Sequence, residues 1–233
     1  TRGVLVSSLG GASQVPTVAN IAFVSDIFRF AFCFGVNAVG ASALDPMLLR
    51  WSDQEDITDW NPTATNQAGS LSLSEGTEIV QAIQARQEVL VWTDSAMYGL
   101  QYLGAPLVWG ATLLGSNITI ASPNAAVYSN NIAYWMGTSK FYYYDGTVKT
   151  LPCSVRSYVF DDFNSDQAQQ VICGSNEEFD EIWWFYCSSG VTRNDRYVVY
   201  NYVENIWYYG TLSRSAWIDS DLRDFPMAAT FDG

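Results

Sequence analysis

The amino-acid sequence predicts an all-β protein of the β-propeller type, with blades of about four antiparallel strands. Short apolar or aromatic runs alternate with turn residues, and no capped amphipathic helix longer than about three turns is present. Aromatic residues make up 15% of the 233 residues, which favours strands. A hydrophobic content of 48% is enough for a substantial core. We interpret residues 1–233 as a single propeller-type domain and, because the chain begins at Thr1 rather than Met, as a fragment of a longer protein.

A weak internal repeat supports the blades. Trp92, Trp135 and Trp184 each belong to an apolar run that leads to a second aromatic strand, and they lie 43 and 49 residues apart. A period of about 40 to 50 residues is typical of propeller blades. The run Phe30–Phe34 is interpreted as the start of an earlier copy. Most aromatic side chains are then expected to pack between blades.

The remaining elements follow in chain order. Residues 45–69 are rich in Asp, Asn, Thr and Pro and predict a long inserted loop. Residues 78–86 fit both a helical face and strict alternation, and we favour a strand. Asp145-Gly146 predicts a two-residue hairpin turn. Glu204-Asn205 separates two further aromatic strands, and Gly210 is expected to end the second of them.

Charge and composition exclude several functions. The 11 basic and 24 acidic residues give a net charge of −13, and no basic run is longer than one residue, so tight nucleic-acid binding is not expected. The chain has no His, which removes Ser-His-Asp and Cys-His catalysis and His-ligated metals. No phosphate-binding glycine motif is present, and no cofactor or metal is expected. The apolar stretches near 30–36 and 105–115 are too short to span a bilayer, so we expect a soluble chain without membrane insertion.

The four cysteines contain no Cys-x-x-Cys pair and are best interpreted as isolated buried thiols. A Cys173–Cys187 disulfide is the less favoured alternative. The stretch 162–166 begins like a calcium loop but has Gln167 where glycine is needed and Cys173 where a bidentate Glu is needed. A turn whose side chains bond to its own backbone is therefore preferred.

Carboxylates gather in four clusters. A glycosidase needs two carboxylates about 5 to 10 Å apart, and exposed Trp rings could stack on sugars. No spacing singles out one pair, so surface or loop carboxylates are the preferred interpretation. The clusters are Asp53, Glu55, Asp56 and Asp59; Asp161, Asp162 and Asp166; Glu177, Glu178, Asp180 and Glu181; and Asp219, Asp221 and Asp224.

Several longer segments together resemble the tail nozzle or hub proteins of short-tailed bacteriophages, also called tail tubular protein B or packaged-DNA stabilisation proteins. The similarity runs from about Val15 to Asp219, and the chain looks shorter than a complete family member. The segments are Asp45–Glu55, Trp60–Pro62, Thr65–Gly69, Tyr134–Gly137, Phe141–Gly146 and Asp195–Tyr202.

The resemblance implies a non-enzymatic virion structural protein, assembled in the host cytoplasm and located in the phage tail. It implies a homo-oligomeric, hexameric ring that contacts the tail adaptor and other tail proteins and through which genomic DNA passes without tight binding. The candidate subunit-contact loop comprises Trp51, Asp53, Glu55, Asp56 and Trp60. The alternatives are a carbohydrate-binding or glycan-cleaving propeller, distinguished by three or more Trp rings exposed together, and a stand-alone adhesion module.

Overall fold

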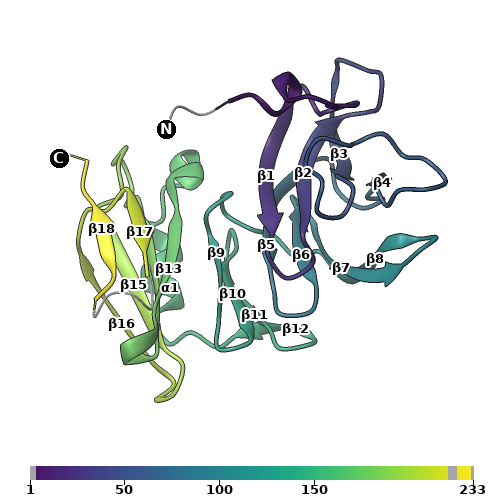
Figure 1. Cartoon of the computed structure of the whole chain (residues 1–233). Helices are drawn as coiled ribbons and strands as arrows, with labels where there is room; N and C mark the ends of the chain where they lie inside the picture. The colour runs from purple at the N-terminus through teal and green to yellow at the C-terminus, as the bar shows by residue number, and fades with distance from the viewer. Residues whose placement is uncertain (1–3, 220–224, 232–233) are drawn as a thin grey trace. The chain divides into compact units, whose positions relative to one another are not determined.

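The computed structural model describes residues 4–219 and 225–231 and confirms an all-β fold (Figure 1). Within these residues the strands form four four-stranded antiparallel sheets and one two-stranded sheet. In every four-stranded sheet, strands that are neighbours in space are also neighbours in sequence. This up-and-down order is that of a propeller blade, so the fold is propeller-type as predicted.

The chain divides into two compact units, Thr1–Asn117 and Ile118–Gly233. That residues 1–233 form a single propeller-type domain stays a prediction. The first unit opens with the 3-10 helix η1 (Val6–Ser8). Its first sheet contains the strands β1 (Ala19–Ser25), β2 (Phe30–Asn37), β3 (Leu44–Trp51) and β4 (Gly69–Ser72). Its second sheet contains the strands β5 (Ile79–Gln84), β6 (Val89–Thr93), β7 (Ala96–Gly104) and β8 (Val108–Ser116).

The second unit contains two four-stranded sheets and the two-stranded sheet. Short helices α1 (Arg156–Asp162), η2 (Ser165–Gln170) and η3 (Glu177–Phe179) connect its strands. The strands are β9 (Ala126–Ser129), β10 (Ile132–Met136), β11 (Phe141–Tyr144) and β12 (Val148–Leu151); β13 (Ile172–Asn176), β14 (Glu181–Tyr186), β15 (Arg196–Asn201) and β16 (Ile206–Thr211); and β17 (Ala216–Ile218) with β18 (Met227–Ala229).

The internal repeat is confirmed at the level of individual strands. Trp92, Trp135 and Trp184 lie on β6, β10 and β14, which are the second strands of their sheets, and all three are fully buried. Phe32 on β2 is buried in the second strand of the first sheet. The predicted strand over residues 78–86 is also confirmed, as β5.

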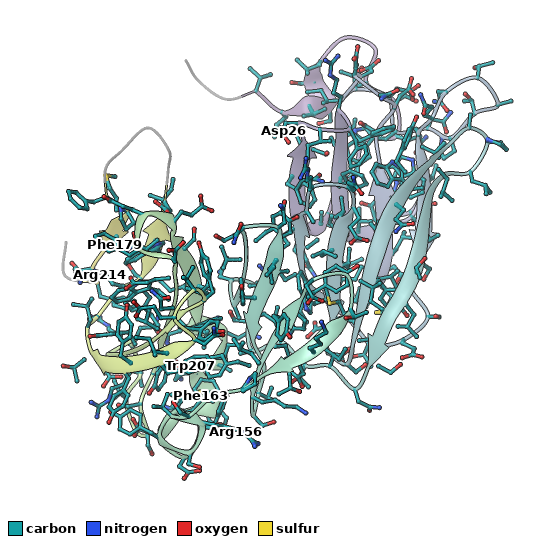
Figure 2. The ribbon with its side chains drawn as sticks, turned by 90° about the horizontal axis from the view of Figure 1, so that it is seen from below. Asp26, Arg156, Phe163, Phe179, Trp207 and Arg214 are labelled. Atoms are coloured by element: carbon teal, nitrogen blue, oxygen red, sulfur yellow. The ribbon has the colours of Figure 1, made fainter. Side chains whose placement is uncertain are left out.

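Aromatic rings join the sheets within each unit. In the first unit the ring of Phe32 meets the edge of Trp109 from β8 at a centroid separation of 5.0 Å. In the second unit Phe141 from β11 lies 4.9 Å from Trp184 and 4.8 Å from Trp207, which is labelled in Figure 2. The expected packing of aromatics between sheets is thus confirmed at these positions.

The indole of Trp217 packs the two-stranded sheet β17–β18 against the sheet β13–β16. Trp217 stacks on Trp183 at 5.4 Å and donates its N–H to the carbonyl of Ser175 at 2.7 Å. A Cβ at Gly174 would lie 2.0 Å from Cδ1 of Trp217. Glycine at position 174 is therefore what lets the indole lie directly on β13.

Two predicted turns differ in detail from the structure. Asp145-Gly146 belongs to a three-residue loop, because Tyr144 pairs with Val148. The extra residue is accommodated because Asp145 accepts hydrogen bonds from the Thr147 hydroxyl at 3.2 Å and from Lys149 Nζ at 2.6 Å. The turn at Glu204-Asn205 is present, but Gly210 continues strand β16 instead of ending it.

All four cysteines are free, as preferred, but only Cys33 and Cys187 are buried, whereas Cys153 and Cys173 are half-buried. Cys173 lies opposite Trp184 on the paired strand, whereas Cys187 follows the end of β14, so the two residues are offset along the ladder. Among the described residues, no helix has the length and apolarity to cross a bilayer.

Replacing Trp184 with alanine is expected to lower the free energy of unfolding by about 3–5 kcal/mol, because the buried indole leaves a large cavity. Its N–H also donates to the carbonyl of Ala125 at 3.1 Å. Urea unfolding followed by circular dichroism measures the change. The matched control is Phe179→Ala in the same unit, where the ring is 51% exposed and a loss below about 1 kcal/mol is expected. Equal losses in the two variants would contradict a core role for the repeated Trp.

Candidate interaction surface

The predicted insertion begins later in the chain than expected. Residues 45–51 are part of strand β3, so the loop between β3 and β4 covers 52–68. The prediction erred because Asp45 and Pro46 are turn-type residues that here occupy the exposed start of a strand. Two backbone hydrogen bonds join the loop to the N-terminal segment: Ser13 N–H donates to Thr58 O, and Trp60 N–H donates to Ser13 O, both at 2.9 Å.

The loop carboxylates mainly hold the loop's own backbone. Asp53 accepts from the N–H groups of Gln54 at 2.9 Å and Gln67 at 2.8 Å. Asp59 accepts from Asn66 Nδ2 at 2.8 Å. Hydrogen bonds from Thr58 to the Asp56 carboxylate lower the pKa of Asp56. These oxygens are therefore used as structural acceptors and do not converge on a common point.

Trp51 at the end of β3 and Trp60 in the insertion are both buried inside the first unit, each 4% exposed, and the contact role of the loop stays a prediction. Trp51 donates to Gln67 O at 2.7 Å, and a Cβ at Gly69 would lie 2.4 Å from its ring. Trp60 donates to Ile57 O at 2.8 Å. Of the predicted contact residues, Glu55 and Asp56 are exposed.

The structure adds a residue that the sequence analysis missed, Arg50, which is 1% exposed. Its guanidinium donates to three backbone carbonyls: Gln14 at 2.6 Å, Asn37 at 3.1 Å and Trp60 at 3.1 Å. Arg50 thus ties the N-terminal segment, the end of β2 and the insertion together. Its position in the run Leu48-Leu49-Arg50-Trp51 was the available signal, because a lone charge between apolar strand residues must find buried partners.

Cys33 lies opposite Arg50 on the neighbouring strand. Burial raises the pKa of the Cys33 thiol to about 11, and the nearby guanidinium opposes part of that rise. Burial also lowers the pKa of Arg50. Both groups are structural members of the interior of the first unit.

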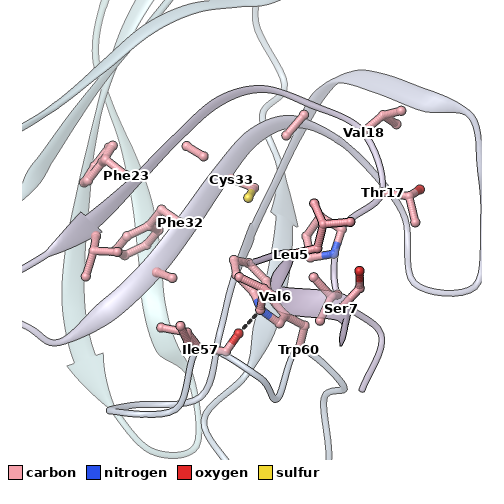
Figure 3. A pocket seen from close by; sticks show the side chains of 16 residues that line it. Leu5, Val6, Ser7, Thr17, Val18, Phe23, Phe32, Cys33, Ile57 and Trp60 are labelled. Atoms are coloured by element: carbon pink, nitrogen blue, oxygen red, sulfur yellow. Dashed lines mark hydrogen bonds between the residues drawn. The ribbon is translucent and has the colours of Figure 1, made fainter. Parts of the chain in front are cut away.

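An apolar groove lies beside this interior (Figure 3). Its volume is about 480 Å³, and the side chains around it carry no formal charge. It is formed by η1 and the following segment, by strands β1 and β2, and by the insertion. Its principal lining residues are Leu5, Val18, Val24, Cys33, Ile57 and Trp60.

The other carboxylate clusters are also dispersed among structural contacts. Glu181 accepts from Trp183 Nε1 at 2.8 Å and from the Tyr208 hydroxyl, and Asp162 lies 3.5 Å from Arg196. Asp219 accepts from the N–H of Glu177 at 2.9 Å. Asp221 and Asp224 lie outside the described residues. In the part of the chain that the structure describes, no group of His, Cys, Asp and Glu is placed to hold a metal ion.

The segment 162–166 forms a turn as preferred over a calcium loop. The Asn164 side chain accepts from the N–H of Asp166 at 3.2 Å and thereby caps helix η2. The amide of Asn164 also donates to Val191 O at 2.8 Å. The Asn164 side chain thus serves one local and one distant backbone partner.

Among the described residues there is no group of three exposed Trp rings, which is the feature that would distinguish a sugar-binding face. All nine Trp residues lie within the described ranges, and each is buried or half-buried. The large exposed aromatics are instead Tyr102, Tyr158, Phe179, Tyr209 and Phe225. A cluster of exposed Trp platforms is thus missing from this part of the molecule.

These features define a propeller-type protein that presents apolar and acidic surfaces. No family model and no curated protein matches the chain. Solved structures with some similarity are Hsv2 from Kluyvelomyces marxianus, with 7% identity, a TM-score of 0.45 and coverage of 81% of this chain and 50% of that one, and the N-terminal domain of Nup159, with 11%, 0.43, 91% and 48%. The chain spans about half the length of these structures. The fold assignment above stands on the strand order of each sheet.

Replacing Arg50 with methionine is expected to lower the free energy of unfolding by about 3 kcal/mol, because three backbone carbonyls lose a charged donor. Hydrogen exchange at the N–H groups of Ser13 and Trp60 is expected to accelerate. The control is Arg29→Met, which removes an ion pair with Glu55 whose side chains are 66% and 61% exposed, and a change within about 0.5 kcal/mol is expected. Unchanged exchange in the Arg50 variant would contradict the proposed anchoring.

The Cys33 thiol is expected to make stability fall in alkaline solution. Below its ordinary pKa of 9.0 the thiol is neutral in both the folded and unfolded states. Between pH 9 and about 11 only the unfolded state loses the proton, so the unfolding free energy falls by about 2–3 kcal/mol. The difference between the wild type and Cys33→Ala, measured by urea unfolding from pH 8 to 11, isolates this contribution. A constant difference across that range would be evidence against it.

Proposed function

We propose that the chain is a virion structural protein, a subunit of the short-tail nozzle or hub ring that forms part of a DNA ejection channel. The observation that carries the proposal is the resemblance of Asp45–Glu55 and Phe141–Gly146 to nozzle proteins. These segments contain most of strand β3 with the start of its insertion, and strand β11 with the first two residues of the loop that leads to β12. The resemblance therefore falls on elements that build the blades.

The charge supports a conduit role. A channel must confine DNA without gripping it, and repeated subunits of charge −13 would offer repulsion in place of counterion-releasing contacts. The described basic side chains include Arg50, which is buried, and Arg29, which is paired with Glu55. DNA would accordingly pass without tight attachment.

The arrangement of surfaces also suits assembly. A closed ring needs two different complementary patches on each subunit. The exposed carboxylates of Glu55 and Asp56 stay candidates for a polar contact, whereas the loop tryptophans serve the interior. The carbohydrate-binding alternative has less support, because its exposed Trp platforms are not found in the described residues.

The full chain is expected to form closed rings, hexameric as the resemblance implies, and the ring fraction is expected to rise with salt. Carboxylates on neighbouring subunits repel one another, and the screening length falls from about 30 Å at 0.01 M salt to about 8 Å at 0.15 M. Native mass spectrometry and negative-stain microscopy measure the outcome. A monomer at every protein and salt concentration contradicts the proposal.

A labelled DNA duplex provides the second arm of the same experiment. Fluorescence anisotropy is expected to show no saturable binding at low salt, because the net charge of −13 repels the phosphates. Binding that weakens steeply as salt is added would show phosphate contacts and would argue against a sliding conduit.

A further inference from the structure

A polar pocket in the second unit is lined by helix α1 and strand β15. Helix α1 begins at Arg156 and is followed by Phe163, and both residues are labelled in Figure 2. The pocket has a volume of about 420 Å³, which lies within the range of ligand sites. Its lining residues are Ser157, Tyr158, Asp161, Asp162 and Arg196.

Strand pairing brings three side chains of the sheet β13–β16 to the face that α1 covers. Tyr186 pairs with Arg196, and two residues further along β15 Val198 pairs with Tyr209. Paired residues share a face of the sheet and every second residue returns to it, so Tyr186, Arg196 and Tyr209 lie on one face. Helix α1 contacts this face through Tyr158, whose ring centroid is 3.9 Å from that of Tyr209.

The Tyr186 hydroxyl has no hydrogen-bond partner in the described part of the chain, although the side chain is fully buried. Leaving a buried hydroxyl unsatisfied costs free energy. Burial raises the pKa of Tyr186, and the nearby Tyr158 and Asp162 raise it further. The charge of Arg196 opposes the rise. The hydroxyl therefore lies among the residues that line the pocket and lacks a polar group to satisfy it.

Carboxylates outnumber the cation at this pocket. Arg196 Nε lies 3.5 Å from Asp162 Oδ2 and 3.8 Å from Asp195 Oδ2, so two carboxylates share one positive charge. Asp161 has no ion pair or hydrogen bond within the described residues. The local charge is negative, and it attracts a cation and repels an anion. A metal ion is not the expected cation, because no group in the described ranges is placed to hold one.

An aromatic wall stands beside the carboxylates. Tyr158 stays 38% exposed although its ring packs on Tyr209, which is itself 46% exposed. A guanidinium group suits this combination, because it is planar and stacks on an aromatic ring while its N–H groups donate to a carboxylate. An ammonium group is a point charge and lacks the flat shape that makes both contacts at once.

We propose that this pocket binds the guanidinium group of an arginine side chain presented by a partner protein. The guanidinium stacks on Tyr158 and donates to the carboxylate of Asp161. The half-buried Arg196 side chain shifts, which lets a further N–H of the ligand reach the Tyr186 hydroxyl. This inference goes beyond the ring function proposed above and does not rest on it.

Nα-acetyl-arginine amide is the probe, and Nα-acetyl-citrulline amide is its match in shape without the charge. NMR titration of the tyrosine ring signals of the full chain measures each dissociation constant. The arginine derivative is expected to bind saturably, with the largest shifts at Tyr158. The citrulline derivative, Nα-acetyl-lysine amide and guanidinium chloride are each expected to bind at least about tenfold more weakly. Equal affinity for the citrulline derivative or for guanidinium chloride would overturn recognition of an arginine side chain.

Two matched variants each remove one exposed carboxylate from the second unit, Asp161→Asn inside the pocket and Glu204→Gln outside its lining. Asp161→Asn is expected to weaken binding of the arginine derivative at least about tenfold. Glu204→Gln should bind it like the wild type. Wild-type affinity in the Asp161 variant, or equal weakening in both, would contradict the proposal, since equal weakening indicates only general charge attraction. Circular dichroism verifies that both variants are folded.

Tyr186→Phe separates binding from stability. Removing a buried hydroxyl that has no partner is expected to leave the melting temperature unchanged or higher. The same change is expected to weaken binding of the arginine derivative by about 3–10-fold, because one acceptor of the bound guanidinium is lost. Wild-type affinity in this variant would overturn the contact with Tyr186.

Discussion

The hydrogen bonds from the buried Arg50 guanidinium to three backbone carbonyls determine the architecture of the first unit. They join three segments that are separate in the sequence: the stretch near Gln14, the end of β2 and the insertion at Trp60. A guanidinium suits this position because its donors form a planar fork that can serve several acceptors at once. The groove and the burial of Trp60 both depend on this junction, because each is built from the segments that Arg50 holds.

Aromatic stacking provides the second constraint, and glycines make it possible. Trp51 lies over Gly69, and Trp217 lies over Gly174, in each case at a separation that a Cβ would not allow. Trp92 on β6, Trp135 on β10 and Trp184 on β14 occupy the same position in their strands, and all three side chains are buried. Trp51 and Gly69 are partners on neighbouring strands of one sheet, whereas Trp217 and Gly174 bring β17 close to β13.

Local patterns predicted much of this fold, and long-range contacts account for what they missed. Alternation and the spacing of Trp92, Trp135 and Trp184 indicated the sheets because both signals are periodic along the chain. The start of the insertion at Ser52, the burial of Trp60 and the role of Arg50 depend on residues from Gln14 to Asn66 meeting in space, which no local pattern specifies. The same reason hides the groove, whose lining comes from three separated segments. A composition signal did exist for part of the groove, namely the absence of charge from Gly3 to Ser25.

The two backbone hydrogen bonds between Ser13 and residues Thr58 and Trp60 have a consequence for synthesis on the ribosome. A nascent chain emerges from its N-terminal end, so residues near Ser13 leave the exit tunnel well before the insertion that binds them. During that interval Ser13 has no partner from the insertion, and the β1–β2 hairpin can form first because its contacts are local. The N-terminal segment is thus among the earliest parts of this unit to be made and among the last to be fastened in place.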